Sequence, residues 1–310
     1  MLGARILSGN ITNKDFELLL HIAEYEPLLV KQLAAVSLRS PQVIRRRIRL
    51  FEKQGLSYRR IRGYGRGPGR PEDLVFLSEK GVKLLQNSGI IHDHASHIGN
   101  TTIESHVADH DLLITWFRIH LIQTQKVIPH LAVNYLSPRY NERIMERISK
   151  DNSQKSIDFI PDGVFSIRNH ETGKSLLFFL EVDLGTETIA SRERGPKDIR
   201  KKILNYQILF RHHHYRHYER VFESRFKGFR LLFLANTVSR LHSLCRLVQE
   251  MSPSDFIWLT EQRKMFSHGI SAKIWARGGR NDKSLQSIVG PNLACENPLG
   301  ISTDQILVFR

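Results

Sequence analysis

Hydrophobic positions recur with a helical period in the first part of the chain. Asn13 is placed to cap a helix whose apolar residues follow the i, i+3, i+4, i+7 pattern, namely Phe16, Leu19, Leu20 and Ala23. A short second helix is expected over residues 29–36. The start of a third is marked by Ser40 as the capping residue and Pro41 in the first turn. The pattern therefore predicts three helices within the first 55 residues.

The third helix has two opposite faces. At 100° per residue, Ile44, Ile48 and Phe51 form one apolar stripe. The other face collects polar and cationic side chains, Gln42, Arg45, Arg46, Arg49 and Lys53. We expect the apolar stripe to be buried and the cationic face to be exposed, where it could contact phosphate groups.

After a Gly55 stop, the pattern predicts a strand over residues 56–64, a glycine-rich loop over 65–70, a strand over 73–78 and a helix over 79–86. This order over residues 10–88 resembles the winged helix-turn-helix domain. The resemblance implies that the third helix enters the DNA major groove. It also implies that Arg66 and Arg70, in the loop, reach the adjacent backbone or minor groove. Dimerisation or protein contact is the alternative role of such a domain.

Residues 89–101 show no sustained period and form the expected linker. Beyond them, over residues 102–275, the pattern predicts the order helix, three strands, helix, strand, helix, strand, which is a mixed α/β domain. Residues 276–310 are rich in Gly, Asn and Ser and are expected to form a loop-rich extension that ends in a short strand.

The segment over residues 157–183 carries the candidate chemistry. Residues 157–160 and 175–182 are expected to be paired strands, joined by the polar connection 169–174. Because side chains alternate along a strand, Glu181 and Asp183 share a face, which Asp162 reaches across the pair. Three converging carboxylates repel each other unless a hard cation such as Mg²⁺ lies among them.

The order helix, three strands, helix, strand, with Pro161-Asp162 and then Glu181-x-Asp183, resembles the PD-(D/E)xK nuclease fold. Asp183 stands where that pattern has lysine. Lys202, beside the apolar stripe of the following helix, is the candidate to supply the missing charge. Together with the winged helix, the motifs IPDGVF, FFLEVDLGTET and KKILNY resemble the replication-relaxation family of mobile-element proteins. The match runs from residue 10 to about residue 260.

That family is similar to a class of plasmid mobilisation relaxases that are proposed to nick DNA with a metal-dependent nuclease core. The resemblance implies that Asp162, Glu181 and Asp183 hold Mg²⁺ or Mn²⁺, and that Lys202 stabilises the charge that develops on the phosphate. Glu104 or His106, on the preceding helix, would orient a ligand or take a proton. The partners expected are double-stranded DNA, other replication or mobilisation proteins, and a second copy of the chain in a homodimer.

Three other interpretations stay open. Asp162 could cap a turn while Glu181 and Asp183 pair with Arg192, Arg194 or Lys201, which would give a non-catalytic DNA-binding accessory factor with a degenerate nuclease fold. A transcription repressor with an effector domain is another possible function, and it would need a large apolar pocket. In residues 211–220, His213 and His217 have the spacing of metal ligands, but a basic helix face near DNA fits this segment better.

Charge supports the choice of DNA. The 310 residues carry a net charge of +15, and the first ninety hold sixteen Lys and Arg against eight Asp and Glu. A lipid surface would call for an amphipathic helix with bulky apolar anchors instead. With two isolated cysteines and no apolar run long enough for a secretion signal or a membrane helix, we expect a cytoplasmic protein.

Overall fold

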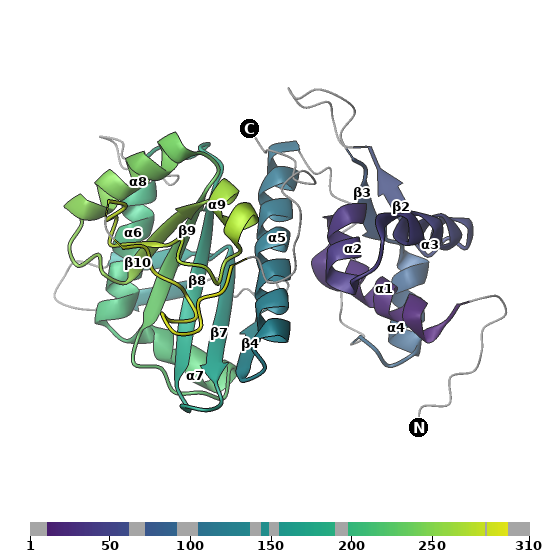
Figure 1. Ribbon diagram of the computed structural model, residues 1–310, viewed down its shortest axis with the longest axis horizontal. Coiled ribbons are helices and arrows are strands. Elements are labelled where there is room, and N and C mark those ends of the chain that lie inside the picture. The colour runs from purple at the N-terminus through teal and green to yellow at the C-terminus, as the bar shows by residue number, and fades with distance from the viewer. Residues whose placement is uncertain are drawn as a thin grey trace. The chain divides into compact units, whose positions relative to one another are not determined.

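The computed structural model describes residues 11–61, 72–91, 105–136, 144–148, 155–189, 198–282 and 284–296. Its internal contacts divide the chain into two units, Met1–Ile119 and His120–Arg310. The division falls within one long helix, α5 (Ser105–Val127), which is visible in Figure 1. Most of the predicted linker, residues 89–101, lies outside the described residues, so its position stays a prediction.

The N-terminal unit has the winged helix-turn-helix arrangement that the sequence predicts. Its elements are α1 (Asn13–Tyr25), β1 (Leu28–Leu29), α2 (Val30–Ser37), α3 (Pro41–Lys53), β2 (Ser57–Arg60), β3 (Leu74–Leu77) and α4 (Glu79–Asn87). The three strands form an antiparallel sheet in the order β1-β3-β2. The loop between β2 and β3, which would be the wing, lies outside the described residues over 62–71.

The helix starts follow from their capping residues. The predicted cap of α1 is wrong by one residue, because Thr12 occupies the cap position and its backbone N–H donates to Asp15 Oδ2 at 2.9 Å. At α3 the prediction is confirmed, since Ser40 Oγ accepts from the Val43 N–H at 3.4 Å and Pro41 opens the helix. The apolar stripe Ile44, Ile48 and Phe51 is buried, as expected.

The second part of the chain is a mixed α/β structure, as predicted. After α5 come β4 (Leu131–Tyr135), β5 (Ile144–Ile148), β6 (Lys155–Phe159), β7 (Gly163–Asn169), β8 (Ser175–Asp183), α6 (Ile199–Arg211), the 3-10 turn η2 (His214–Arg216), α7 (His217–Val221), β9 (Phe229–Ala235), α8 (Val238–Glu250), β10 (Ile257–Glu261), α9 (Gln262–His268) and β11 (Ala276–Arg277). The central sheet has the order β11-β10-β9-β8-β7-β4. In it β8, β9 and β10 are parallel.

One predicted strand pairing is wrong. The antiparallel partner of β8 is β7, and the register pairs Gly163 with Leu180 and Arg168 with Ser175. Residues 157–159 instead belong to β6, which pairs with β5 in a separate two-stranded sheet. The chain changes sheet at Pro161-Asp162, because proline cannot donate a ladder hydrogen bond. Asp162 consequently lies immediately before β7, and the polar turn 169–174 joins β7 to β8.

Both faces of the central sheet are buried. One face packs against α6, α8 and the η2-α7 segment through residues such as Leu177, Phe179, Leu231 and Phe233. The alternate residues of the same strands, including Phe178, Leu180, Leu232 and Leu234, are also fully buried. Strands buried on both faces have nearly continuous apolar sequences, which explains the runs in β8 and β9. The helix-covered face continues into the polar site described below.

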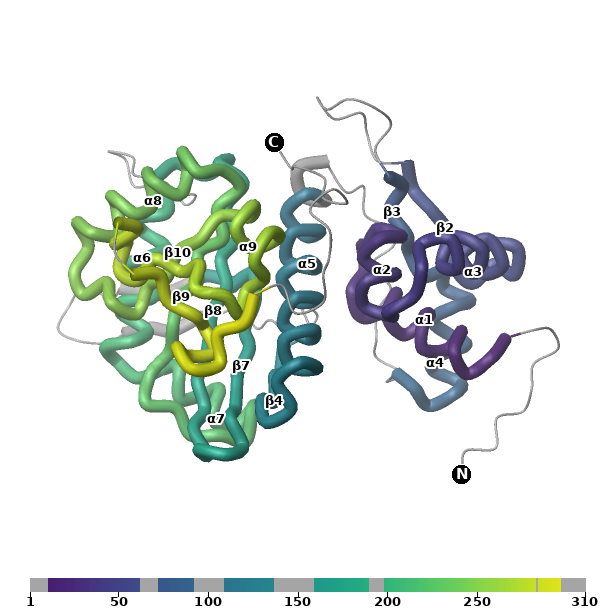
Figure 2. The backbone as a smooth tube through the Cα atoms, in the orientation of Figure 1, coloured from purple at the N-terminus to yellow at the C-terminus, as the bar shows by residue number. Residues whose placement is uncertain are grey.

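The segment after α9 folds back on itself (Figure 2). Trp275 pairs with Gln286 in an isolated bridge, and Ser271 Oγ donates to the Cys295 carbonyl at 2.9 Å. Ile288 and Val289 are buried, so part of the predicted extension is packed against the unit. The strand predicted over residues 306–309 lies outside the described residues. No helix in the described ranges has both the length and the apolar character needed to span a membrane.

A buried histidine makes the stability of the C-terminal unit depend on pH. Burial lowers the pKa of His120 to about 4, and its Nε2 has no hydrogen-bond partner among the described residues. Above the pKa that His120 has in the unfolded chain, its side chain is neutral in both states and its burial costs no protonation energy. As the pH falls towards the lower pKa of the folded state, the unfolded chain binds a proton that the folded chain does not, so the unfolding free energy decreases. We expect the wild type to lose about 3 kcal/mol more unfolding free energy between pH 7 and pH 4 than His120→Leu.

Denaturant unfolding at both pH values measures this difference. The control is His242→Leu, at an exposed position on α8, which we expect to follow the wild type. Equal acid destabilisation of the wild type and His120→Leu would contradict the assignment of this pH dependence to His120.

Candidate functional site

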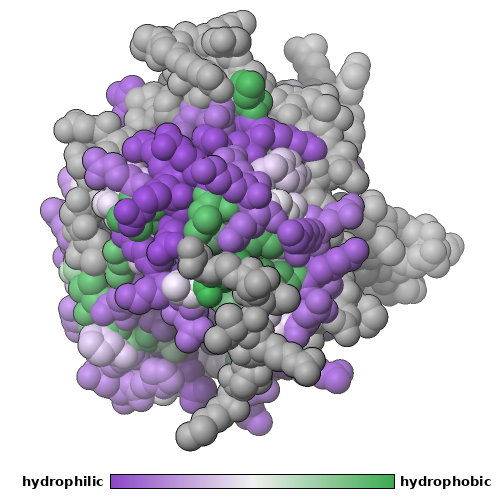
Figure 3. Space-filling view, turned by 90° about the vertical axis from the view of Figure 1, so that its right-hand side faces the viewer, coloured by the Kyte–Doolittle hydropathy of each residue, from purple (hydrophilic) through white to green (hydrophobic). Residues whose placement is uncertain are grey.

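The cationic face predicted on α3 is exposed. Gln42, Arg45, Arg46, Arg49 and Lys53 all lie at the surface, and Arg46 and Arg49 make no ion pair with any described residue. Arg47, on the inner side, lies 3.4 Å from the buried Asp15 carboxylate. Hydrophilic residues dominate the described surface in Figure 3. Arg66 and Arg70 lie outside the described residues.

The strand register brings Glu181 and Asp183 to one face of β8 and places Asp162 next to this strand. Gly163 of β7 lies opposite Leu180 of β8, which places Asp162 beside Glu181. The backbone N–H of Val182 donates to Asp162 Oδ2 at 2.7 Å. Glu181 and Asp183 continue the alternation of the buried Leu177 and Phe179, so both point to the face covered by α6 and α8. The prediction that Glu181 and Asp183 share one face of the strand is therefore confirmed.

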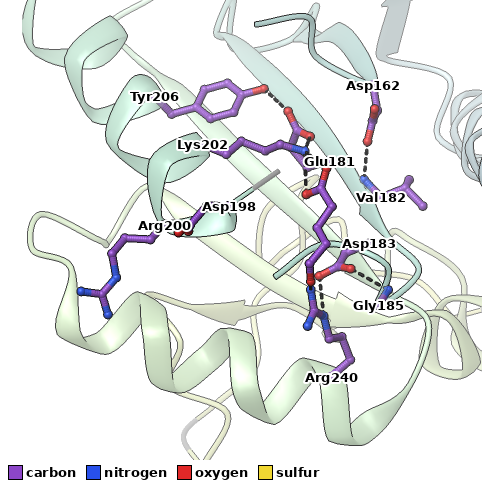
Figure 4. A network of polar contacts seen from close by, with 11 residues as sticks. Asp162, Glu181, Val182, Asp183, Gly185, Asp198, Arg200, Lys202, Tyr206 and Arg240 are labelled. Carbon is purple, nitrogen blue, oxygen red and sulfur yellow. Dashed lines mark hydrogen bonds and ion pairs between the residues drawn. The ribbon is translucent and has the colours of Figure 1, made fainter. Parts of the chain in front are cut away.

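Glu181 lies at the centre of a buried polar network. Its side chain is 1% exposed, and Lys202 Nζ donates to its Oε2 at 2.8 Å. The Tyr206 hydroxyl donates to its Oε1 at 2.5 Å. Figure 4 shows both partners reaching Glu181 from α6. Lys202, the lysine predicted from the sequence, thus contacts the predicted Glu181. Tyr206 is an additional partner of Glu181, and the sequence pattern did not predict its hydrogen bond because Tyr206 lies in the apolar stripe of α6.

The electrostatics of this network are those of crowded, buried charges. Burial raises the pKa of Glu181 to about 7, with a further contribution from the Asp162 charge, against the lowering effect of Lys202. Burial alone would lower the pKa of Lys202, but Glu181, Asp162 and Glu187 together raise it above its ordinary value. Burial and Glu181 raise the pKa of Tyr206 as well. Lys202 therefore stays a cation and Tyr206 a neutral donor at physiological pH.

Asp183 is held by a different helix. Its Oδ2 accepts from Arg240 Nε at 2.7 Å, and its Oδ1 accepts from the backbone N–H of Gly185 at 2.7 Å. Gly185 has φ +79, so it serves as a turn residue after β8. Arg240 was not identified from the sequence. The feature that could have identified Arg240 is its position in the first turn of α8, the helix that follows β9, because β9 is the parallel neighbour of β8.

A second layer of contacts fixes the two cations. Glu187, in the segment after β8, lies 3.2 Å from Lys202 Nζ, and its backbone carbonyl accepts from Arg240 at 2.6 Å. Asp198 caps α6 by accepting from the Arg200 N–H at 2.8 Å, which sets the start of the helix that carries Lys202. The segment between β8 and α6 therefore links the Glu181 and Asp183 contacts.

The donor set fits a divalent cation only in part. The Asp162 carboxylate is close enough to Glu181 to raise the pKa of Glu181, and two neighbouring carboxylates are a partial ligand set for a hard ion. Asp183 has both oxygens engaged. The part of the chain that the structure describes contains no group of three His, Cys, Asp or Glu side chains that could hold a metal, His213 and His217 included. Glu104 and the side chain of His106 lie outside the described part.

The chain thus combines a winged helix with a mixed α/β unit that contains a buried network of Glu181, Lys202 and Tyr206. The profile of the replication-relaxation family matches residues 19–224. The chain belongs to the replication-relaxation family. This match includes α3, Asp162, Glu181 and Lys202, and it confirms the family resemblance that the motifs indicate.

Comparisons with other proteins add little beyond the family. No curated protein sequence matches the chain significantly. Among solved structures, MepR, a transcription regulator of the Staphylococcus aureus multidrug efflux pump MepA, is 21% identical with a TM-score of 0.22, over 26% of this chain and 56% of MepR. The transcriptional regulator SlyA is 19% identical with a TM-score of 0.22, over 38% of this chain and 75% of SlyA. The chain thus spans less than two thirds of MepR, and similarity at this level carries no functional conclusion.

Proposed function

We propose that this chain is a DNA-binding protein of plasmid or mobile-element replication or mobilisation, and that its C-terminal unit nicks DNA with the help of Mg²⁺ or Mn²⁺. The observation that carries the proposal is the contact of Lys202 with Glu181 beside Asp162. In this proposal Lys202 supplies the positive charge that the PD-(D/E)xK pattern has at the position occupied here by Asp183. Membership of the replication-relaxation family supports the same role, and the exposed cationic face of α3 supports DNA as the partner.

Each residue of the site has a separate task in this proposal. Asp162 and Glu181 would hold the metal ion, which when bound polarises the scissile phosphate and lowers the pKa of the attacking water. Lys202 places a fixed positive charge where the phosphate gains negative charge. Tyr206 is a positioning residue, because its hydroxyl fixes one oxygen of Glu181. Its burial argues against a covalent role for this tyrosine as nucleophile.

The test is nicking of supercoiled plasmid that carries the origin region of the element, with Mg²⁺ or Mn²⁺. We expect open-circular product from the wild type and at least about 100-fold less from Asp162→Asn, because the charge that would hold the ion is gone. Asparagine keeps an oxygen that can accept from the Val182 N–H, so the fold should persist. Asp282→Asn, at an exposed position of the same unit, is the control and should nick normally.

A second function is favoured by one specific observation. Both oxygens of Glu181 and both oxygens of Asp183 have protein partners, and a satisfied buried ion network can be purely structural. The chain would then be a non-catalytic DNA-binding accessory factor. No open-circular product from the wild type with either ion, or wild-type nicking by Asp162→Asn, would favour this function over the first.

A further inference from the structure

A basic cavity lies at the end of the central sheet opposite the candidate site. It has a volume of about 1190 Å³ and is lined by the β7-β8 turn, the starts of β8 and β9, and the loop before β10. Ser175 at the start of β8 is six residues from Glu181, which corresponds to about 20 Å along a strand. The cavity is therefore separate from the Glu181 network.

Positive charge dominates the lining. Six cationic side chains face two acidic ones, Glu219 and Asp255, and the six are Lys174, Arg216, Arg225, Lys227, Arg230 and Arg277. The two acids are already engaged. Asp255 accepts from Arg280 at 2.6 Å and lies 3.6 Å from Arg277, while Glu219 accepts from the Phe226 N–H at 2.8 Å. Five of the six cations have no carboxylate partner among the described residues.

Arg230 is held in a defined position in the cavity by its contact with a buried aromatic ring. Its guanidinium lies 4.4 Å from the ring centroid of Trp258, which is 5% exposed. Burial and the neighbouring Arg277 lower the pKa of Arg230. A half-buried arginine beside a second cation is costly without an anion, and the contact with the Trp258 ring holds its planar guanidinium in place.

The shape and the aromatic residues of the cavity favour a phosphate backbone over a base. Phe210 and Phe256 stack on each other at 5.1 Å, and both pack edge-on against Phe229. Because these rings pack against one another, the charged side chains are the groups that would contact a ligand in the cavity. A volume of this size also exceeds the usual range of about 300–1000 Å³ for a small-ligand pocket.

We propose that this cavity binds the phosphodiester backbone of duplex DNA away from the candidate site, with Arg230 as its central contact and Lys174, Arg225 and Lys227 around it. The inference rests on the proposed DNA binding of the chain. It adds a second DNA-contact region, in the C-terminal unit, to the one proposed on α3. Arg216 in this cavity belongs to the basic segment 211–220.

Brief lysine acetylation of the full chain, read by mass spectrometry, tests the proposal without any amino-acid substitution. A 40-base-pair duplex should protect Lys174 and Lys227 at least about 3-fold, and it should also protect Lys53 on α3, while exposed Lys273 should react as in the free protein. Protection of Lys53 alone would overturn the cavity proposal and leave DNA binding intact. Protection of none of the three would overturn both. Protection of Lys174 and Lys227 by ATP but not by DNA would assign the cavity to a free nucleotide.

Matched variants give an independent measurement by fluorescence anisotropy with the same duplex. Lys174→Ala with Lys227→Ala should weaken binding about 3- to 10-fold and lower the slope of log K against log salt by about 2, since each phosphate contact contributes about 0.9. Lys126→Ala with Lys273→Ala removes the same charge from exposed positions outside the cavity. Equal effects from the two pairs would overturn the proposal. Arg230→Gln should weaken binding further than the lysine pair.

Discussion

Lys202→Met is expected to reduce DNA nicking by about 100- to 1000-fold, the usual loss when one preorganised electrostatic contact to the transition state is removed. Lys202 Nζ donates to Glu181 at 2.8 Å and stays positively charged because three carboxylates surround it. Methionine keeps much of the apolar stem but no charge. The measurement is the initial rate of open-circular product, with Lys201→Met, the exposed neighbour on the same helix, as the control.

A loss of folding could imitate this result, because removing one partner of a buried pair leaves the other charge uncompensated. The double variant Glu181→Gln with Lys202→Met separates the two explanations. It removes both charges, while the glutamine side chain that replaces Glu181 could still accept from the Tyr206 hydroxyl, so its unfolding free energy should recover towards that of the wild type. Nicking should stay lost. Wild-type nicking by folded Lys202→Met would show that this lysine has no part in the reaction.

The parts of the site that the sequence predicted correctly are those set by a repeating geometry. The alternation along β8 placed Glu181 and Asp183 on one face, and the helical period of α6 placed Lys202 beside the sheet. Both inferences need only the local backbone. The period of α3 likewise separated its buried stripe from its exposed cations.

The errors and omissions come from pairing between distant segments. Residues 157–160 have the composition of a strand, and residues 157–159 do lie in one, but the partner of that strand is β5 rather than β8. Arg240 follows Asp183 by 57 residues, and only the parallel pairing of β8 with β9 brings the start of α8 to the same edge. A single sequence does not specify which strands pair, so it could not show that Asp183 is held by an arginine.

Replacing Arg45, Arg46 and Arg49 together by alanine is expected to weaken binding of duplex DNA by more than about 100-fold at about 0.1 M salt. The three side chains are exposed on one face of α3, and alanine favours helix, so the winged helix should still fold. If each arginine neutralises one phosphate, the slope of log K against log salt should fall by about 2.7. Anisotropy over a salt series measures both quantities, and circular dichroism checks the helix content.

The control for α3 is the pair Lys14→Ala and Lys83→Ala, which removes exposed charge from α1 and α4 of the same unit. A change in net charge alone would weaken binding in proportion to the charge removed, wherever it lies. Direct contacts predict a much larger loss per charge on α3, because each lost arginine also returns a condensed counterion to the DNA. Equal losses per charge in the two variants would contradict α3 as the helix that contacts DNA. A large loss confined to α3, with the nicking site intact, would separate delivery of DNA by the N-terminal unit from chemistry at Asp162, Glu181 and Lys202.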